Sequence, residues 1–134
     1  MAYEFLEHTA DVRMRVTGTS LEGLFSDALA GLMELLQPGS PAGPAVRRPV
    51  SLSAGDATAL LVDFLSDALL SALTRRERYD GLAVRELTER NIAAELIGAP
   101  VAGFADDVKA VTYHEAELSR GPDGQWETVI VFDV

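Results

Sequence analysis

The chain has 134 residues, of which 48% are hydrophobic and 24% charged, with a formal net charge of −10. This size and composition are typical of one globular domain with one core, so we treat residues 1–134 as a single domain. The acidic balance argues against strong direct binding to nucleic acid, which needs a basic face. The absence of cysteine excludes disulfides, thiolate chemistry and zinc held by sulfur.

The sequence carries no targeting or membrane signal that we recognise. Its N-terminus lacks the basic and apolar regions of a secretory signal. The most apolar stretch, residues 57–73, contains Asp63 and Asp67 and is slightly short for a transmembrane helix. We therefore expect a cytoplasmic protein that has no membrane partner.

The first elements in the chain are two strands and a helix. Residues 3–8 and 12–17 alternate between apolar and polar side chains, as strands do, and the segment His8-Thr9-Ala10-Asp11 interrupts them. The spacing of Thr19 and Glu22 then predicts a capping box at the start of a helix. Apolar residues recur every three or four positions to Leu36, and Gln37-Pro38-Gly39 predicts the end of this helix.

A Pro/Gly/Ser loop and a short strand, "VSLSA", lead to a second helix, from an N-cap at Asp56 to about Arg75. The apolar stripe expected to face the core comprises Leu60, Leu61, Phe64, Leu65, Ala68, Leu69, Ala72 and Leu73. Strands follow at about 82–88, 91–97, 110–119 and 125–131, with "RGPDG" as a hairpin loop between the last two.

This order of elements predicts the fold class. Two amphipathic helices each need a surface to cover, and the strands after the second helix suit a mainly antiparallel sheet. The simplest arrangement places both helices on one face of that sheet, which is an α+β two-layer sandwich.

The familiar catalytic motifs are missing from the sequence. It contains no GxxxxGK[ST] or GxGxxG phosphate loop, no HExxH and no GxSxG. With two histidines and no cysteine, few pairs of nucleophile and base remain. These counts alone leave Ser-His-Asp catalysis open.

The C-terminus is the first candidate site. The apolar strand "WETVIVF" ends at Asp133 and Val134, so a side-chain carboxylate and the terminal carboxylate lie close together. Two neighbouring anions favour a cation between them, and Asp11 can supply a third hard oxygen. Such ligands suit Ca²⁺, Mg²⁺ or Mn²⁺. The alternative is that Asp11 caps a turn and the termini lie in water without an ion.

Other polar side chains near the strand ends also have two interpretations. Lys109 is the only lysine beside ten arginines, and it is either a functional cation or a solvated edge charge. His8 and His114 are either functional or structural histidines. Asp63 and Asp67 share one face of the second helix, which suits a solvated face or a docking surface for a basic partner.

Three segments resemble the archease family: "YEFLEHTADVRMRV" with the helix after it, "VKAVTYHEAEL", and "DGQWETVIVFDV" at the C-terminus. The resemblance implies a small α+β protein that is not itself an enzyme and that assists the GTP-dependent RNA ligase of tRNA splicing and RNA repair. Archeases promote guanylylation of the ligase and its multiple turnover, and they can broaden the nucleoside triphosphates that it accepts.

The resemblance also implies roles for particular residues. It implies a divalent metal, assigned as Ca²⁺ with Mg²⁺ or Mn²⁺ as alternatives, held by Asp11, Asp133 and the carboxylate of Val134. It implies a function for Lys109 in activating the ligase. His8 lies in the first of the three segments and His114 in the second, and both are further candidates for a role in activating the ligase.

Other functions stay open at this point. The first is a chaperone-like modulator of other tRNA- or nucleic-acid-modifying enzymes, such as tRNA methyltransferases. A stand-alone metal-dependent hydrolase is the second, although no arrangement of nucleophile and general base supports it. The third is a structural subunit without a bound metal.

Overall fold

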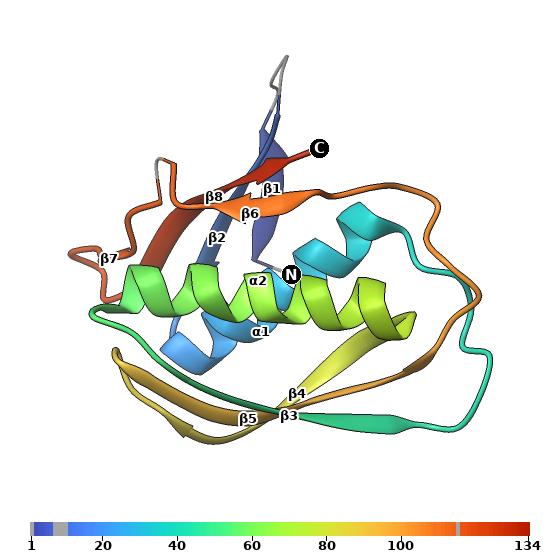
Figure 1. Ribbon diagram of the computed structural model, residues 1–134. Coiled ribbons are helices and arrows are strands. Elements are labelled where there is room, and N and C mark those ends of the chain that lie inside the picture. The colour runs from blue at the N-terminus through green and yellow to red at the C-terminus, as the bar shows by residue number, and fades with distance from the viewer. Residues whose placement is uncertain (1, 7–10, 115) are drawn as a thin grey trace.

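Two helices lie between two β-sheets in the computed structural model, which describes residues 2–6, 11–114 and 116–134 (Figure 1). The first sheet has the order β1-β2-β8-β6, and β7 also pairs with β8. Its strands are β1 (Tyr3–Leu6), β2 (Val12–Gly18), β6 (Ala110–Thr112), β7 (Ser119–Arg120) and β8 (Trp126–Asp133). The second sheet has the order β3-β5-β4, with β3 (Val46–Ser53), β4 (Glu77–Leu87) and β5 (Asn91–Pro100).

Both helices are capped by side chains. In α1 (Leu21–Leu36) the cap is Ser20, whose hydroxyl accepts a hydrogen bond of 3.0 Å from the N–H of Gly23. The predicted cap at Thr19 is therefore one residue early, because Ser20 has the extended backbone that a cap needs. In α2 (Ala57–Arg75) the predicted cap is confirmed, since Asp56 accepts from the N–H of Ala59 at 2.8 Å.

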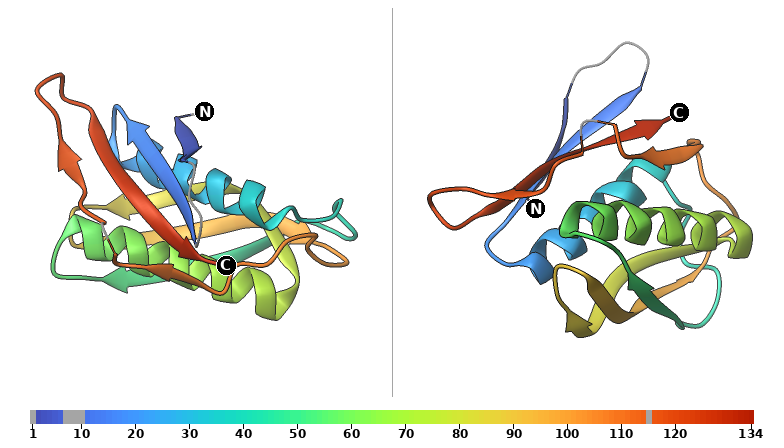
Figure 2. Two further views of the ribbon diagram at one scale, coloured as in Figure 1. Left: turned by 90° about the horizontal axis from the view of Figure 1, so that it is seen from above. Right: turned by 60° about the vertical axis from the view of Figure 1, so that its left-hand side comes forward.

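The helices are buried from more than one side. Each contacts strands of both sheets, and Figure 2 shows them running between the two layers of strands. Phe25 of α1 and Phe64 of α2 join the helices, with ring centroids 5.4 Å apart. The predicted α+β class, with two amphipathic helices on antiparallel strands, is confirmed. The expected single sheet is two sheets, because the apolar stripes of the helices are broad enough to need cover on both sides.

The largest differences from the predicted strand boundaries are in β4 and in the segment 110–119. β4 begins at Glu77 rather than at residue 82, and its pairing with β5 shifts register between Tyr79 and Gly81, so "YDG" is a bulge inside a strand. The predicted strand 110–119 is wrong at residues 113, 114 and 116–118, which lie between β6 and β7. There the chain turns toward α2, where the hydroxyl of Tyr113 donates to Asp63 and the N–H of Leu118 donates to Thr58 Oγ1 at 2.9 Å.

The helix α2 is long and apolar enough to cross a bilayer by length and composition alone. Half of the apolar window is buried inside the fold, where the helix contacts β3, β4, β5 and β6. This burial is that of a core helix. Leu70 and Leu73 are the large apolar side chains of this helix that lie exposed at the surface.

Candidate functional site

The C-terminal end of β8 brings three strands together. β8 lies between β2 and β6, with Val12 opposite Phe132 on one side and Ala110 opposite Asp133 on the other (Figure 1). Asp11 directly precedes Val12 and therefore lies at the same end of the paired strands as Asp133. The pairing continues one residue before β6, because the N–H of Lys109 donates to the carbonyl of Asp133 at 2.8 Å.

A hollow of about 250 Å³ opens at this end of the sheet. It is lined by Asp11, Thr112, His114, Val131, Phe132 and Asp133. Three residues predicted from the sequence, Asp11, His114 and Asp133, therefore share one site. Thr112 holds the strand end in place: its hydroxyl donates to the carbonyl of Val131 at 3.1 Å and accepts from the N–H of His114 at 3.3 Å.

The donors at this end can be compared with the needs of a divalent metal. Within the described part of the chain, no three His, Cys, Asp or Glu side chains converge as metal ligands. The side chains of Asp11 and Asp133 provide two carboxylates, which are hard oxygen donors. Val134, a residue that is 42% exposed, follows Asp133 directly and carries the terminal carboxylate. This donor set fits Ca²⁺, Mg²⁺ or Mn²⁺ if Val134 completes it, and the metal stays a prediction. His8 lies outside the described residues.

Lys109 lies beside the same strand end but lines a second hollow, of about 220 Å³, between β6 and α2. The other residues around it are Ser66, Leu69, Leu70, Leu73, Ala110 and Val111. The backbone of Lys109 is thus tied to Asp133, while its exposed side chain borders the outer surface of α2. The structure does not place Lys109 among the residues that line the hollow of Asp11 and Asp133.

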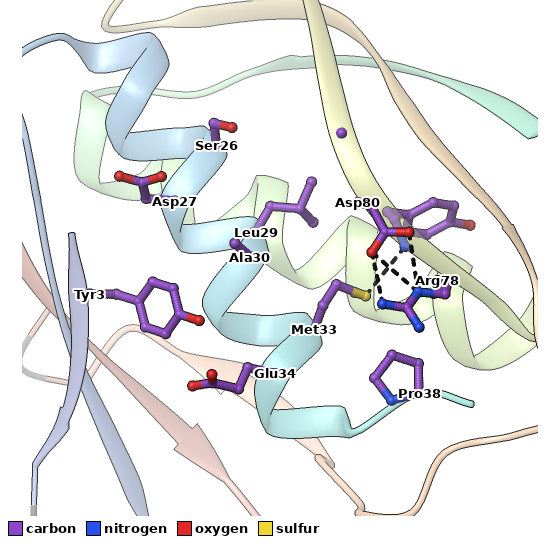
Figure 3. A pocket seen from close by; sticks show the side chains of 12 residues that line it. Tyr3, Ser26, Asp27, Leu29, Ala30, Met33, Glu34, Pro38, Arg78 and Asp80 are labelled. Atoms are coloured by element: carbon purple, nitrogen blue, oxygen red, sulfur yellow. Dashed lines mark hydrogen bonds and ion pairs between the residues drawn. The ribbon is translucent and has the colours of Figure 1, made fainter. Parts of the chain in front are cut away.

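A larger hollow, of about 460 Å³, lies elsewhere, between α1, β1 and β4 (Figure 3). Arg78 faces Asp80 in it with nitrogen–oxygen distances of 3.0–3.1 Å and also donates to the carbonyl of Gly39 at 3.0 Å. Burial, and then the neighbouring carboxylate of Glu34, raise the pKa of Tyr3 at its edge. Of the site residues predicted from the sequence, those that the structure describes, Asp11, Lys109, His114, Asp133 and Val134, do not line this hollow.

A buried polar network was not predicted from the sequence. Glu77, only 4% exposed, accepts two hydrogen bonds from Arg48, at 2.9 and 2.5 Å, and one of 2.9 Å from the hydroxyl of Tyr79. The bonds from Arg48 hold the pKa of Glu77 below its ordinary value. Burial raises the pKa of Tyr79 to about 12, and its hydroxyl also bonds Ser71 at 2.7 Å. Since the network joins β3, β4 and α2 through satisfied partners, its role is structural.

Comparisons of the sequence with known proteins give matches that cover nearly the whole chain. The "Archease protein family (MTH1598/TM1083)" matches residues 3–134. The protein archease of Thermococcus kodakarensis is 30% identical over 139 residues, covering 98% of both chains. That of Methanosarcina barkeri is 29% identical over 141 residues, covering 98% of this chain and 95% of its own.

Solved structures share the fold. The solution structure of Methanobacterium thermoautotrophicum protein 1598 superposes with a TM-score of 0.73 and 22% identity over 99% of each chain. The crystal structure of a Thermotoga maritima protein described as an archease and possible chaperone gives a TM-score of 0.70 and 19% identity, over 96% of this chain and 94% of its own. With the family pattern matched from residue 3 to the last residue, this chain belongs to the archease family.

Proposed function

We propose that this protein is a non-catalytic accessory protein that activates the GTP-dependent RNA ligase of tRNA splicing and RNA repair. It promotes guanylylation of the ligase and multiple turnover, and it can broaden the ligase's use of nucleoside triphosphates. The observation that carries the proposal is the meeting of Asp11, His114 and Asp133 around one hollow, with Lys109 bonded to Asp133 through the backbone. The description of the Thermotoga maritima relative as a possible chaperone also suits an accessory role.

The chemistry of guanylylation explains why such groups are useful. A ligase histidine attacks the α-phosphate of GTP, a phosphorus–nitrogen bond forms, and pyrophosphate leaves. Negative charge on the phosphate oxygens must be stabilised during this step. A divalent metal bound between the strand ends would supply positive charge for those oxygens.

The protein's own residues have separate parts in this proposal. Asp11 and Asp133 would hold the metal together with the terminal carboxylate of Val134. Lys109 directly precedes β6 and is bonded to Asp133 through its backbone N–H, and its exposed side chain would offer a positive charge to the ligase. Because the hollow is small and open at the end of a sheet, we propose that the ligase completes the site and supplies the nucleophile.

The experiment is a ligation assay in which the ligase is limiting and GTP and RNA ends are in excess. The ligase alone is expected to stop after about one product per enzyme, and the wild-type protein is expected to restore continued turnover. No gain in turnover at any concentration of the protein would contradict the proposal. The purified protein alone should show no ligation or phosphoester hydrolysis.

The second candidate function is a chaperone-like modulator of other tRNA- or nucleic-acid-modifying enzymes. The description of the Thermotoga maritima relative favours it only in general terms. Capture of partners from the native cytosol separates the two candidates. Recovery of an RNA ligase supports the first, whereas recovery of a tRNA methyltransferase without a ligase supports the second.

A further inference from the structure

Asp63 and Tyr113 form a contact that lies outside the hollow at the end of β8. Tyr113 directly follows β6, and its hydroxyl donates a hydrogen bond to the carboxylate of Asp63 on α2. This bond raises the pKa of the Tyr113 hydroxyl, because a carboxylate acceptor favours the protonated phenol. Tyr113 is 58% exposed, so a specific bond, and not burial in the core, ties its side chain to the helix.

The residue after Tyr113 is His114, which lines the hollow of Asp11 and Asp133. Two consecutive side chains therefore serve two different surfaces: the phenol bonds to α2, and the imidazole borders the hollow. A planar peptide unit joins them, and each residue adds two soft backbone dihedrals. Fixing the phenol on α2 thus limits the directions in which the imidazole of His114 can point.

The backbone of His114 is also tied to β8. Its N–H donates to the hydroxyl of Thr112 at 3.3 Å, and that hydroxyl donates to the carbonyl of Val131 at 3.1 Å. β6 and α2 are in contact, and the right-hand view of Figure 2 shows β6, in orange, running along α2, in green. The chain around His114 is therefore held by the sheet on one side and by the helix on the other.

The helix holds this part of the chain at a second point. The N–H of Leu118 donates to Oγ1 of Thr58 at 2.9 Å. Thr58 and Asp63 lie about 7.5 Å apart along the axis of α2. Leu60 and Leu61, between them in the sequence, are fully buried. Because the inner side of α2 is packed in the core, the helix is a rigid support for both attachments.

We propose that Asp63 and Tyr113 are positioning residues: their hydrogen bond holds His114 at the hollow that Asp11 and Asp133 line. The inference rests on the proposed function, because it concerns how the same site is kept in its active arrangement. An imidazole held there offers a hydrogen bond to the ligase or its GTP without first losing rotational freedom. Asp63 then acts inside this chain and is more than a solvated charge on a helix.

The first test needs no ligase. The NMR spectrum of the imidazole groups contains signals from two histidines, and His114→Gln identifies the signal of His114. In Asp63→Ala this signal should shift and broaden, because the imidazole loses its fixed orientation. In Asp63→Asn it should stay close to that of wild type, since an amide oxygen can still accept the bond from the phenol.

Asp67→Ala is the matched control. It removes the same charge one turn further along α2, where Asp67 borders a different hollow together with Leu70 and Ser71. The His114 signal should not change in this variant. Thermal unfolding checks that each variant is folded, and Tyr113→Phe, which removes one exposed hydroxyl, keeps the test decisive if Asp63→Ala is unstable.

The second test is ligase guanylylation at a saturating concentration of each variant. Asp63→Ala and Tyr113→Phe should lower the rate about three- to tenfold, and Asp63→Asn should stay within about twofold of wild type. The half-saturating concentration should not change, because the phenol positions His114 and does not bind the ligase. In the His114→Gln background, Tyr113→Phe should cause no further loss, since no imidazole remains to be positioned.

The outcomes separate this inference from the proposed function. If wild type does not raise guanylylation, the proposed function fails, and the NMR comparison alone decides whether Asp63 holds His114. If wild type activates the ligase and the His114 signal is the same in Asp63→Ala, the positioning role is overturned and the proposed function stands. An equal loss from Tyr113→Phe with and without His114 would also overturn it, because Tyr113 would then act independently of the imidazole.

Discussion

At the end of β8, individual residues have effects that a binding measurement can separate. Asp11 directly precedes β2 and Asp133 ends the neighbouring strand β8, and the metal proposal adds the α-carboxylate of Val134 as a third ligand. Each removed oxygen donor lowers the charge that holds a hard cation. The metal proposal therefore makes a claim about the terminus as well as about the two aspartates.

We predict that Ca²⁺ binding, measured by calorimetry, weakens at least about tenfold in Asp133→Asn and in a protein extended by a C-terminal tag. Asp123→Asn is the control, because Asp123 lies in the turn at the other end of β8, where it accepts from the N–H of Gln125. Unchanged affinity in the tagged protein would remove Val134 from the site. Unchanged affinity in Asp133→Asn would remove the metal site as a whole.

Glu77 is a buried carboxylate whose charge contributes to stability. Arg48 lowers its pKa from the ordinary value of 4.5, so the folded protein favours the carboxylate. This stabilisation is fully present above about pH 4.5 and is lost as the pH falls through the lowered pKa of the folded state. Acid should therefore weaken the contact between β3, β4 and α2.

We predict that Glu77→Gln lowers the free energy of unfolding at pH 7 by about 1–3 kcal/mol, because two charge-assisted bonds are lost. The variant's stability should also fall less steeply than that of wild type below pH 4.5. Urea unfolding across pH 3–7 measures both effects. Glu95→Gln, whose partners Arg47 and Arg85 have exposed side chains and lie 3.4 Å away on the two strands that flank β5, should cost under about 1 kcal/mol. Equal losses in the two variants would contradict this account of Glu77.

Among the elements, the pairing of β4 with β5 depends on one close approach. Gly98 lies opposite Tyr79, next to the register shift in β4. A Cβ at position 98 would overlap the backbone carbonyl of Arg78, and backbone cannot move aside as a side chain can. The bulge therefore requires glycine on the partner strand.

We predict that Gly98→Ala lowers the free energy of unfolding by about 3 kcal/mol, as overpacking against backbone does. Gly55→Ala is the matched control, because a Cβ there meets nothing within 4 Å. Chemical unfolding of the two variants provides the comparison. A loss in Gly98→Ala no larger than that in Gly55→Ala would show that β4 and β5 adjust freely at the bulge.

The helices could be predicted from the sequence and the strands only in part. Caps and apolar spacing are local signals, so Asp56 and the end of α2 at Arg75 are confirmed. The strand predicted at 110–119 was wrong because Tyr113 and Leu118 bond to side chains of α2, which no local pattern records. Leu73 was assigned to the core stripe, yet it is 38% exposed, and Leu70 fell outside that stripe. An apolar residue off the stripe was the available signal that α2 exposes a large apolar side chain.

At the scale of the whole molecule, the candidate site depends on strand order. Asp11 and Asp133 lie near opposite ends of the sequence, and the antiparallel pairing of β2 with β8 brings them to the same end of these two strands. The same order puts β6 on the other side of β8, so that the backbone of Lys109 bonds to Asp133 while its side chain borders α2. Neither the split into two sheets nor the position of α2 beside β6 could be derived from periodicity, because both depend on contacts between distant segments.

The most direct test of the account is the rate of ligase guanylylation in the presence of Asp11→Asn, Asp133→Asn and the control Asp123→Asn. Covalent guanylate on the ligase is followed with labelled GTP, at a saturating concentration of each variant. We predict that Asp11→Asn and Asp133→Asn lower the rate about 10–100-fold, because both remove charge from the end of β8, and that Asp123→Asn matches wild type. Wild-type rates with Asp11→Asn and Asp133→Asn would contradict the claim that this end of the sheet activates the ligase.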